Sequence, residues 1–171
     1  MNFRRFLSPD AIQLSLNTHT TPDGEVAEDF DPTGRQNLTR VREGVIGELT
    51  DLLAATGRMA NRNRLFRDLH NREKKAVTAV GQGIALPHVR TLQVKNFVMA
   101  FGRSREGLPF NAPDEEPVHL FFAMAAPPYD DRTYLKVYRS LARVLLDPEH
   151  HEHFLTAEEP SEILRALELL G

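Results

Sequence analysis

The chain has 171 residues, of which 41% are hydrophobic and 26% are charged, and this composition fits one globular domain with its own core. Its formal net charge of -3 gives no overall basic field for nucleic acid or an anionic membrane, and the absence of cysteine excludes disulfides, thiolate metal sites and a cysteine nucleophile. No apolar run approaches the roughly 20 residues that span a bilayer and no apolar signal segment follows the N-terminal arginines, so we expect a cytoplasmic protein without a membrane segment.

The first predicted elements are a helical turn and a strand, followed by a long polar loop. Ser8 is placed as a helix N-cap, with Pro9 at the first helical position, and the alternation in AIQLSL predicts a short strand. Residues 17–37 are polar and rich in Thr, Asp, Gly and Pro. A loop of this length is uncommon in a domain, and we predict that this one is mobile and can be shortened without loss of phosphate acceptance.

Two helices are predicted after this loop. Apolar residues at helical spacing mark one face of the first helix: Val41, Val45, Leu49, Leu52 and Leu53. Gly57 is placed to end that helix. The second helix is predicted to follow Asn61 and to bury three side chains: Leu65, Phe66 and Leu69.

Strand patterns fill the middle of the chain. Residues 76–80 are short and partly β-branched, residues 96–102 form a better strand, and residues 117–125 form the best one. The last of these is almost continuously apolar, which is typical of a central strand covered on both faces.

Helical spacing returns near the C-terminus. One helix is marked by Leu135, Tyr138, Leu141, Ala142 and Leu145 and should end before Asp147. A last helix should start near Ser161 and turn four leucine or isoleucine side chains inward: Ile163, Leu164, Leu167 and Leu170. Helices on both ends of a strand-rich middle predict an α/β fold, with a mixed β-sheet sandwiched between helices in a single compact domain over residues 1–171.

The stretch VGQGIALPH, residues 80–88, places a histidine directly after a proline. Pro87 fixes its own backbone angle and favours an extended Leu86, so His88 is held on a stiff, apolar support. Apolar surroundings favour the neutral imidazole, whose free nitrogen is a nucleophile suited to taking a phosphoryl group. A histidine that is merely satisfied in a turn is the simpler alternative.

The longer stretch HNREKKAVTAVGQGIALPH resembles the signature of the type-2 enzyme IIA domains of the bacterial phosphotransferase system, the fructose, mannitol and nitrogen-regulatory group. The family pattern is matched without a gap by Arg72, Glu73, Thr78, Gly81, Gly83, Ile84, Ala85, Leu86, Pro87 and His88. Further matches in the family's order, from SPDAIQLSL to the LARVLLD helix, extend the resemblance over nearly the whole chain.

The resemblance implies that His88 accepts a phosphoryl group and that Arg72 steadies it. A guanidinium offers a fixed fork of donors to the charge that a transferred phosphoryl group spreads over its oxygens. A surface ion pair of Arg72 with Glu73 or Asp68 is the alternative for that residue.

Supporting roles stay open for three other matched residues. The Thr78 hydroxyl either donates to phosphate or imidazole, or the residue merely suits a strand. Gly81 and Gly83 either turn backbone N–H groups toward the phosphate or allow a tight turn.

The chain also departs from the family. Many members have a second histidine near the active site, and this chain has Tyr134 in that place. A phenol of pKa about 10 is a poor proton partner at neutral pH, which puts fast transfer to the usual sugar-transport partner in doubt. Phosphate acceptance itself needs only one histidine.

Two functions follow from the resemblance. In the first, an HPr-like phosphocarrier protein phosphorylates His88, and no metal or organic cofactor is required. The phosphate then passes to a IIB component of a sugar transporter. In the second, the phosphorylation state controls binding to a regulatory target protein. Because no IIB segment accompanies the domain in this sequence, we expect the stand-alone, nitrogen-regulatory kind.

Other titratable residues are given structural roles. Three histidines gather near the C-terminus, where a solvated helix end is favoured over a metal site: His150, His151 and His153. His119 is expected to be satisfied within its strand, and His70 to pack against Phe66. Asp114 is expected to lie in a solvated acidic turn, and a carboxylate that orients an imidazole is the alternative.

Overall fold

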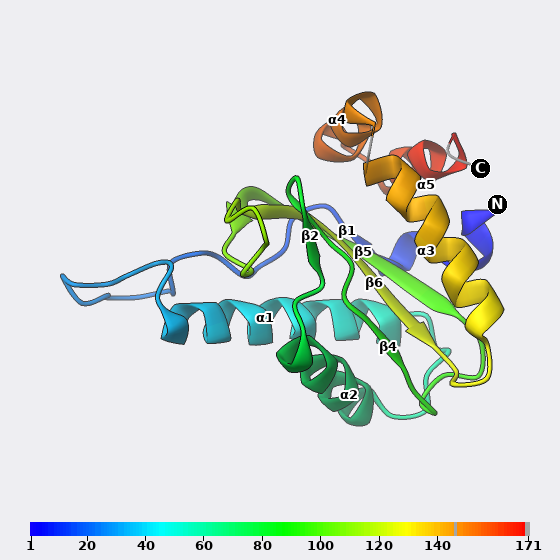
Figure 1. Ribbon diagram of the computed structural model, residues 1–171, viewed down its shortest axis with the longest axis horizontal. Helices are drawn as coiled ribbons and strands as arrows, with labels where there is room; N and C mark the ends of the chain where they lie inside the picture. The colour runs from blue at the N-terminus through cyan, green and yellow to red at the C-terminus, as the bar shows by residue number, and fades with distance from the viewer. Residues whose placement is uncertain (146, 170–171) are drawn as a thin grey trace.

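The computed structural model describes residues 1–145 and 147–169, and in this part of the chain a mixed sheet of six strands lies between two groups of helices (Figure 1). The strands are β1 (Ile12–Gln13), β2 (Ala79–Gly81), β3 (Ile84–Ala85), β4 (His88–Arg90), β5 (Val98–Leu108) and β6 (Val118–Ala126). The α-helices are α1 (Arg35–Ala54), α2 (Arg62–Lys75), α3 (Asp131–Leu145), α4 (Pro148–Thr156) and α5 (Pro160–Glu168). Two short 3-10 turns, Phe3–Arg5 and Pro9–Ala11, precede β1.

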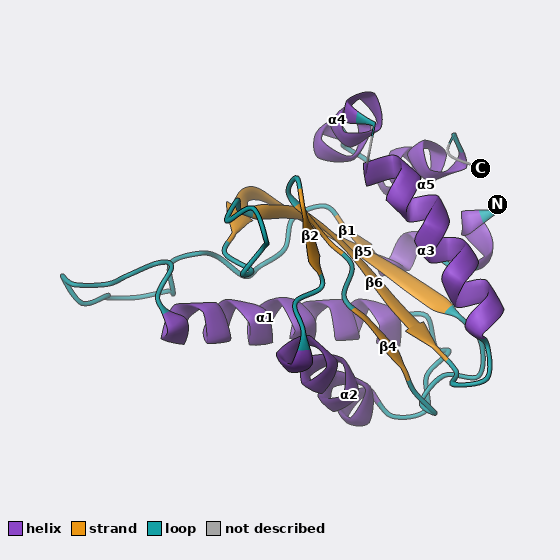
Figure 2. Cartoon of the chain, in the orientation of Figure 1, coloured by secondary structure: helices purple, strands orange, loops and turns teal. Residues whose placement is uncertain are grey.

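Helices cover both faces of the sheet, as Figure 2 shows. The pair α1 and α2 packs on one side, where α1 contacts β5 and α2 contacts β4. On the other side, α3, α4 and α5 form a second layer, and α4 contacts β6. The predicted α/β class and the single mixed sheet between helices are confirmed.

The sheet order brings distant segments together at one end of β6. The order is β1-β5-β6-β3-β2, and β4 also pairs with β6. β5 and β6 are antiparallel, whereas β3 and β4 run parallel to β6. The register His88↔Met124 places the start of β4 beside the carboxyl end of β6, and α3 begins only five residues after that strand ends at Ala126. The chain therefore carries α3 back over the edge where His88 lies.

β6 is the buried centre of the domain. Every residue from Leu120 to Ala126 is buried, as the apolar run predicted. Phe101 of β5 and Phe154 of α4 contact the ring of Phe122 edge-on, so aromatic packing joins the sheet to its second helical layer. The prediction of a central strand covered on both faces is confirmed.

The helices on the first face form for the reasons that the sequence suggests. The α1 side chains Val41, Val45 and Leu49 are fully buried. Asn61 caps α2, since its side chain accepts a hydrogen bond from the Arg64 N–H. Gly57 has a φ of +69°, which favours glycine, and it closes the turn after α1.

Several predicted boundaries were wrong. The loop predicted for residues 17–37 ends at Gly34, because Asn37 is buried in the first turn of α1 and donates to the Thr20 and Pro32 carbonyls. The strand predicted at residues 76–80 begins at Ala79. β5 continues six residues past Gly102, and α4 is a separate helix that Asp147 caps.

The helical spacing that predicted α3 does not coincide with its buried face. Leu135 is 45% exposed, whereas Tyr134, Val137 and Leu141 are buried. The face that contacts the sheet is therefore rotated away from Leu135, and Tyr134 turns inward. The predicted inward side chain of Leu170 lies outside the described part of the chain, as does the side chain of Leu145.

The first residues of the long loop are tied to α1, and the loop then extends beyond the start of that helix in Figure 1. The Glu48 carboxylate accepts from the Asn17 and Thr18 backbone N–H groups, and Arg40 donates to the His19 and Thr20 carbonyls. Mobility of the loop and its dispensability stay predictions. Among the described helices, none combines the length and the apolar character that crossing a membrane requires.

Candidate functional site

His88 is the first residue of β4, and a backbone carbonyl fixes its ring. Its Nδ1 lies 2.7 Å from the Leu86 carbonyl oxygen. A carbonyl oxygen only accepts hydrogen bonds, so Nδ1 carries the proton and donates it. In the neutral ring the lone pair is then on Nε2, which is the nitrogen available to attack an electrophile.

Arg72 lies beside that nitrogen. It is in the last turn of α2, and its Nη2 is 3.4 Å from His88 Nε2. Its Nη1 donates to the Ala76 carbonyl at 2.9 Å, which holds the guanidinium at the end of the helix. Among the described ion pairs, none joins Arg72 to Glu73 or Asp68, so the structure does not support the surface ion pair.

Two tyrosines of α3 form an aromatic wall against the imidazole. The ring centroid of Tyr134 lies 5.4 Å from that of His88, and the ring of Tyr138 meets His88 edge-on at 6.1 Å. The place of the second family histidine is therefore next to His88 in this chain as well, but it holds a buried phenol.

Burial lowers the pKa of His88 below 6.5, and the positive charges of Arg72 and Arg90 lower it further, while the hydrogen bond to Leu86 opposes them. The shift favours the neutral ring, whose Nε2 lone pair faces Arg72.

We predict that NMR titration of the His88 ring protons gives a midpoint below 6.5 in the folded protein, rising toward the ordinary value in urea. Because the folded state holds this proton less tightly than the unfolded chain, His88 should contribute to stability above pH 6.5 and lose that contribution as the pH falls below it. A midpoint at or above 6.5 in the folded protein would contradict the assignment of a desolvated ring.

His88 opens into a surface cleft of about 730 Å³ between α2, β4 and the start of α3. Polar groups of α2 line one side: Asp68, Asn71, Arg72 and Lys75. Tyr134 and Arg90 line the other side. The Asp68 carboxylate accepts from the Thr91 hydroxyl at 2.6 Å, which ties α2 to the chain after β4.

Sequence reasoning missed Arg90, although a signal for it was present. Residues two apart on a strand share a face, and Arg90 follows His88 by two. The exposure along β4 agrees, since Val89 is buried between a half-buried His88 and an exposed Arg90. Arg90 Nη1 lies 2.6 Å from Asp131 Oδ1, and its guanidinium lies over the Tyr134 ring.

Thr78 is buried and serves the frame around the cleft. Its hydroxyl donates to Glu73 Oε2 at 2.6 Å, and its backbone N–H donates to Glu73 Oε1. Its carbonyl accepts from the Leu86 N–H. Burial raises the pKa of Glu73, while both bonds from Thr78 oppose the shift. These contacts fix the end of α2, and hence Arg72, relative to the support of His88.

Gly81 and Gly83 form the tight turn between β2 and β3. Both have a positive φ, +92° and +76°, and Gln82 between them donates its N–H to Asp114. This turn lies at the end of the hairpin remote from α2 in Figure 1. The structure therefore supports the tight-turn alternative for these glycines, and Asp114 holds a turn rather than an imidazole.

The other histidines lie outside the cleft. His119 Nδ1 donates to the Ser104 carbonyl, and the ring of His70 stacks on Phe66. His150 pairs with Asp147 at the start of α4. Within residues 1–145 and 147–169, no cluster of side chains is arranged to hold a metal ion.

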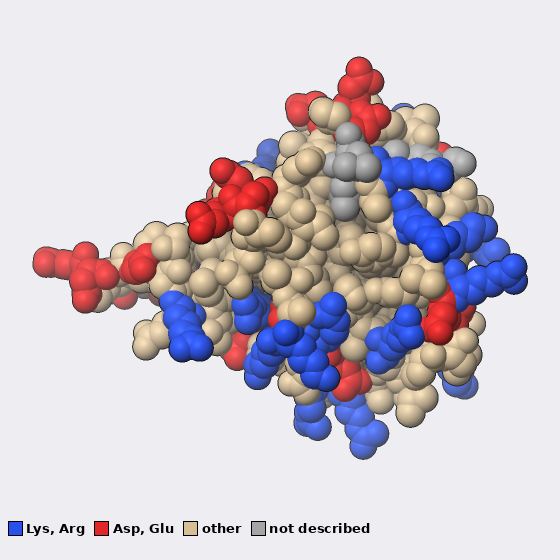
Figure 3. Space-filling view, viewed as in Figure 1, with Lys and Arg blue, Asp and Glu red and all other residues tan. Residues whose placement is uncertain are grey.

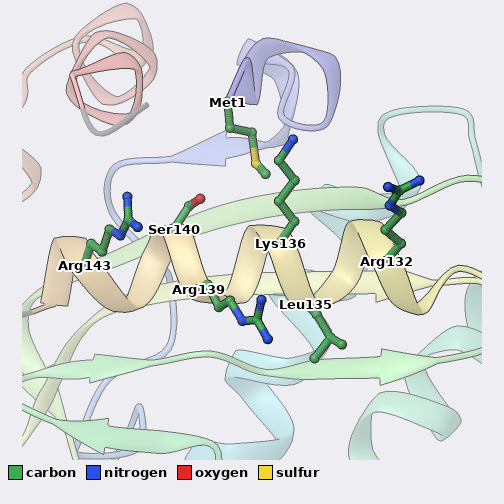
Figure 4. A pocket seen from close by; sticks show the side chains of 7 residues that line it. All are labelled: Met1, Arg132, Leu135, Lys136, Arg139, Ser140 and Arg143. Atoms are coloured by element: carbon green, nitrogen blue, oxygen red, sulfur yellow. The ribbon is translucent and has the colours of Figure 1, made fainter.

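A second depression, of about 500 Å³, follows the outer side of α3 (Figure 4). Its exposed basic side chains, which also gather over α3 in Figure 3, are Arg132, Lys136, Arg139 and Arg143. The net charge of the chain conceals this local cluster. Its described lining contains no histidine, so the cleft at His88 is the candidate site.

Comparisons with known proteins point to one family. The family model described as "Phosphoenolpyruvate-dependent sugar phosphotransferase system, EIIA 2" matches residues 36–169. A fructose-specific EIIA component of Haloferax volcanii is 37% identical over 117 residues, which are 68% of this chain and 76% of that protein. A fructose-specific EIIABC component of Bacillus subtilis is 33% identical over 126 residues, which are 74% of this chain but only 20% of that longer protein. The crystal structure of the nitrogen regulatory protein IIA-Ntr from Neisseria meningitidis has a TM-score of 0.78 and 27% identity, and the match covers 98% of this chain and 99% of that one.

Proposed function

The chain belongs to the EIIA type 2 family of the phosphoenolpyruvate-dependent sugar phosphotransferase system, and on that premise we propose that it is a phosphohistidine carrier whose acceptor is His88. The observation that carries the proposal is the orientation of the ring. Leu86 holds the Nδ1 proton, and Nε2 lies 3.4 Å from a guanidinium in an open cleft.

The transfer is a displacement at phosphorus between two imidazoles. The Nε2 lone pair of His88 forms a bond to the phosphorus of a phosphohistidine on an HPr-like donor. The donor's N–P bond breaks, and its electron pair returns to the donor ring. The phosphorylated His88 ring keeps its Nδ1 proton and becomes cationic, and the Leu86 carbonyl stabilises that charge as a hydrogen-bond acceptor.

Catalysis of such a step is positioning and charge stabilisation. The step needs no metal or organic cofactor, because one nitrogen–phosphorus bond replaces another. Arg72 supports the transfer, since its guanidinium can bind the equatorial oxygens of the phosphoryl group as they approach Nε2. Thr78 supports it indirectly through Glu73, and the glycines shape the hairpin that precedes His88.

We further propose that the phosphorylated state is read by a regulatory target protein. Tyr134 in place of the second histidine and the likeness to IIA-Ntr favour this function. A phosphate adds nearly two negative charges to the cleft, which changes its match to a partner surface. The likeness to the fructose-specific EIIA component supports the second candidate, onward transfer to a IIB component.

The proposal is tested by incubating the protein with phosphoenolpyruvate, enzyme I and an HPr-type protein and then measuring its intact mass. We expect a gain of one phosphoryl group, and none when the HPr-type protein is omitted. An unchanged mass under conditions that phosphorylate a known IIA domain would overturn the carrier function.

We predict that Arg72→Ala keeps the fold but slows phosphorylation, by about 2–4 kcal/mol of barrier, the range for a lost preorganised donor. Arg72→Lys should recover part of the rate, because an ammonium lacks the planar fork. Single-turnover transfer from the phosphorylated HPr-type protein measures both rates, and Arg64→Ala, an exposed site at the start of α2, is the control. If the Arg72→Ala variant were phosphorylated at the wild-type rate, Arg72 would be a surface charge that takes no part in the transfer.

Tyr134→His separates the regulatory from the transport function. We predict that the wild type accepts phosphate but delivers it poorly to sugar-type IIB domains, and that Tyr134→His raises the delivery rate, since a second imidazole can balance charge beside His88. Tyr138→His, at the neighbouring ring, is the matched control. Fast delivery by the wild type to a panel of sugar-type IIB domains would instead support transport.

A further inference from the structure

Arg90 lies at the edge of the His88 cleft, where its guanidinium is partly exposed and forms one ion pair. Its side chain is 46% exposed and pairs with Asp131, whose side chain is 60% exposed. An ion pair with this exposure contributes little to stability. The pair can therefore open at little cost if a stronger anion comes within reach.

The position of Arg90 brings it within reach of a group on His88. The two side chains leave the same face of β4, and two residues along a strand span only about 7 Å. The Arg90 guanidinium carbon lies 5.2 Å from the centroid of the Tyr134 ring, and the centroid of the His88 ring lies 5.4 Å from that same ring centroid. The positive charge of Arg90 also lowers the pKa of His88. Arg72 approaches Nε2 from α2, and Arg90 lines the same cleft from β4.

The Asp131 side chain has a second favourable electrostatic environment besides Arg90. Asp131 is the first residue of α3, and a helix N-terminus favours a negative charge. A phosphoryl group carries nearly two negative charges and three acceptor oxygens, so it attracts the guanidinium more strongly than a single exposed carboxylate does.

We propose that Arg90 is a second phosphoryl-binding guanidinium and that Asp131 binds it while His88 is unphosphorylated. In the unphosphorylated protein Arg90 pairs with Asp131. When His88 is phosphorylated, Arg90 exchanges that carboxylate for phosphoryl oxygens, so that Arg72 and Arg90 bind the group from two sides. This inference rests on the proposed phosphorylation of His88.

The exchange gives the phosphorylated state a second surface change. Asp131 loses its partner and presents a free carboxylate at the start of α3, on the rim of the cleft. A protein that docks over His88 thus meets two new negative features, the phosphate and the Asp131 carboxylate. This coupling allows a reader protein to distinguish the two states over a wider surface than the phosphate alone covers.

The test is a double-mutant cycle on the equilibrium of phosphate exchange with the HPr-type protein, measured by intact mass. Asp131→Asn should raise the equilibrium constant for phosphate transfer to this protein about two- to fivefold. This range corresponds to the free energy of an exposed ion pair, which no longer competes with the phosphoryl group for Arg90. Arg90→Gln should lower the constant roughly tenfold, as expected for a lost charge-assisted bond. In the Arg90→Gln background, Asp131→Asn should have no further effect.

Arg132→Gln, an exposed arginine outside the cleft, is the matched control and should match the wild type. Thermal unfolding of the unphosphorylated variants checks that each is folded. The exchange of Asp131 for phosphoryl oxygens would be contradicted if Asp131→Asn alone did not change the equilibrium constant, or if it had the same effect with and without Arg90. In either case His88 would still gain phosphate. Absence of phosphate on the wild type would overturn the proposed function itself.

Discussion

His88→Ala is expected to abolish phosphorylation while the domain stays folded. The ring is the group in the cleft whose nucleophilic nitrogen is unprotonated and faces a guanidinium. Its removal leaves no acceptor there, so the loss should be complete rather than graded. The side chain is only half-buried and belongs to a three-residue strand, so its removal should cost little stability. Intact mass after incubation with the phosphorylated HPr-type protein measures the loss.

Two variants make that result specific. His119→Ala removes another half-buried strand histidine, which bonds to Ser104 outside the cleft, and it should still gain one phosphate. His88→Gln keeps a polar side chain of similar length and should gain none. Phosphate on a folded His88→Ala protein would show that another residue is the acceptor.

Arg103→Ala is expected to destabilise the domain by about 3–5 kcal/mol, which is a large share of the roughly 5–15 kcal/mol that holds a domain folded. Arg103 is fully buried in β5. Its Nε donates to the Leu14 carbonyl, and its Nη1 donates to the Phe154 and Ala157 carbonyls at the end of α4. Loss of the side chain leaves these carbonyls without their donor and opens a cavity between the sheet and the second helical layer.

Urea unfolding of Arg103→Ala beside Arg105→Ala measures the difference, because Arg105 lies two residues along the same strand and is exposed. Arg105→Ala should change the free energy of unfolding by less than about 0.5 kcal/mol. Arg103→Met fills most of the volume but still lacks donors, so it should remain clearly destabilised. Wild-type stability in Arg103→Met would show that packing, and not the hydrogen bonds, is what Arg103 contributes.

The family, the fold class and the pairing of Arg72 with His88 could be predicted because local motifs carry them. Arg72 is in the last turn of α2 and His88 follows one hairpin later, so few long-range contacts decide their approach. The apolar run of β6 likewise reveals its own burial. In these places the sequence pattern and the tertiary environment agree.

Features that depend on pairing between distant segments were missed. Asp131 reaches Arg90 only because β4 runs parallel to β6 and α3 returns over that edge, which local periodicity does not show. Arg103 was taken to lie beyond the strand, because a charged residue does not suggest burial; the carbonyls that satisfy it come from α4, about 50 residues later.

The family motif left open which of its residues face the phosphate and which build the frame around it. Thr78 bonds to Glu73, and the glycines turn a hairpin. A signature of this kind records every residue that the site requires, including those that only build its frame. The structure separates the frame from the groups that face the cleft.

The central claim is that His88 Nε2 is the phosphoryl acceptor, and the most direct test is NMR of the ring nitrogens in the phosphorylated, ¹⁵N-labelled wild type. Because Nδ1 is held by the Leu86 carbonyl, we predict a nitrogen–phosphorus coupling on Nε2 of His88 and a proton retained on Nδ1. Phosphate on Nδ1, or coupling to any other histidine, would contradict the account.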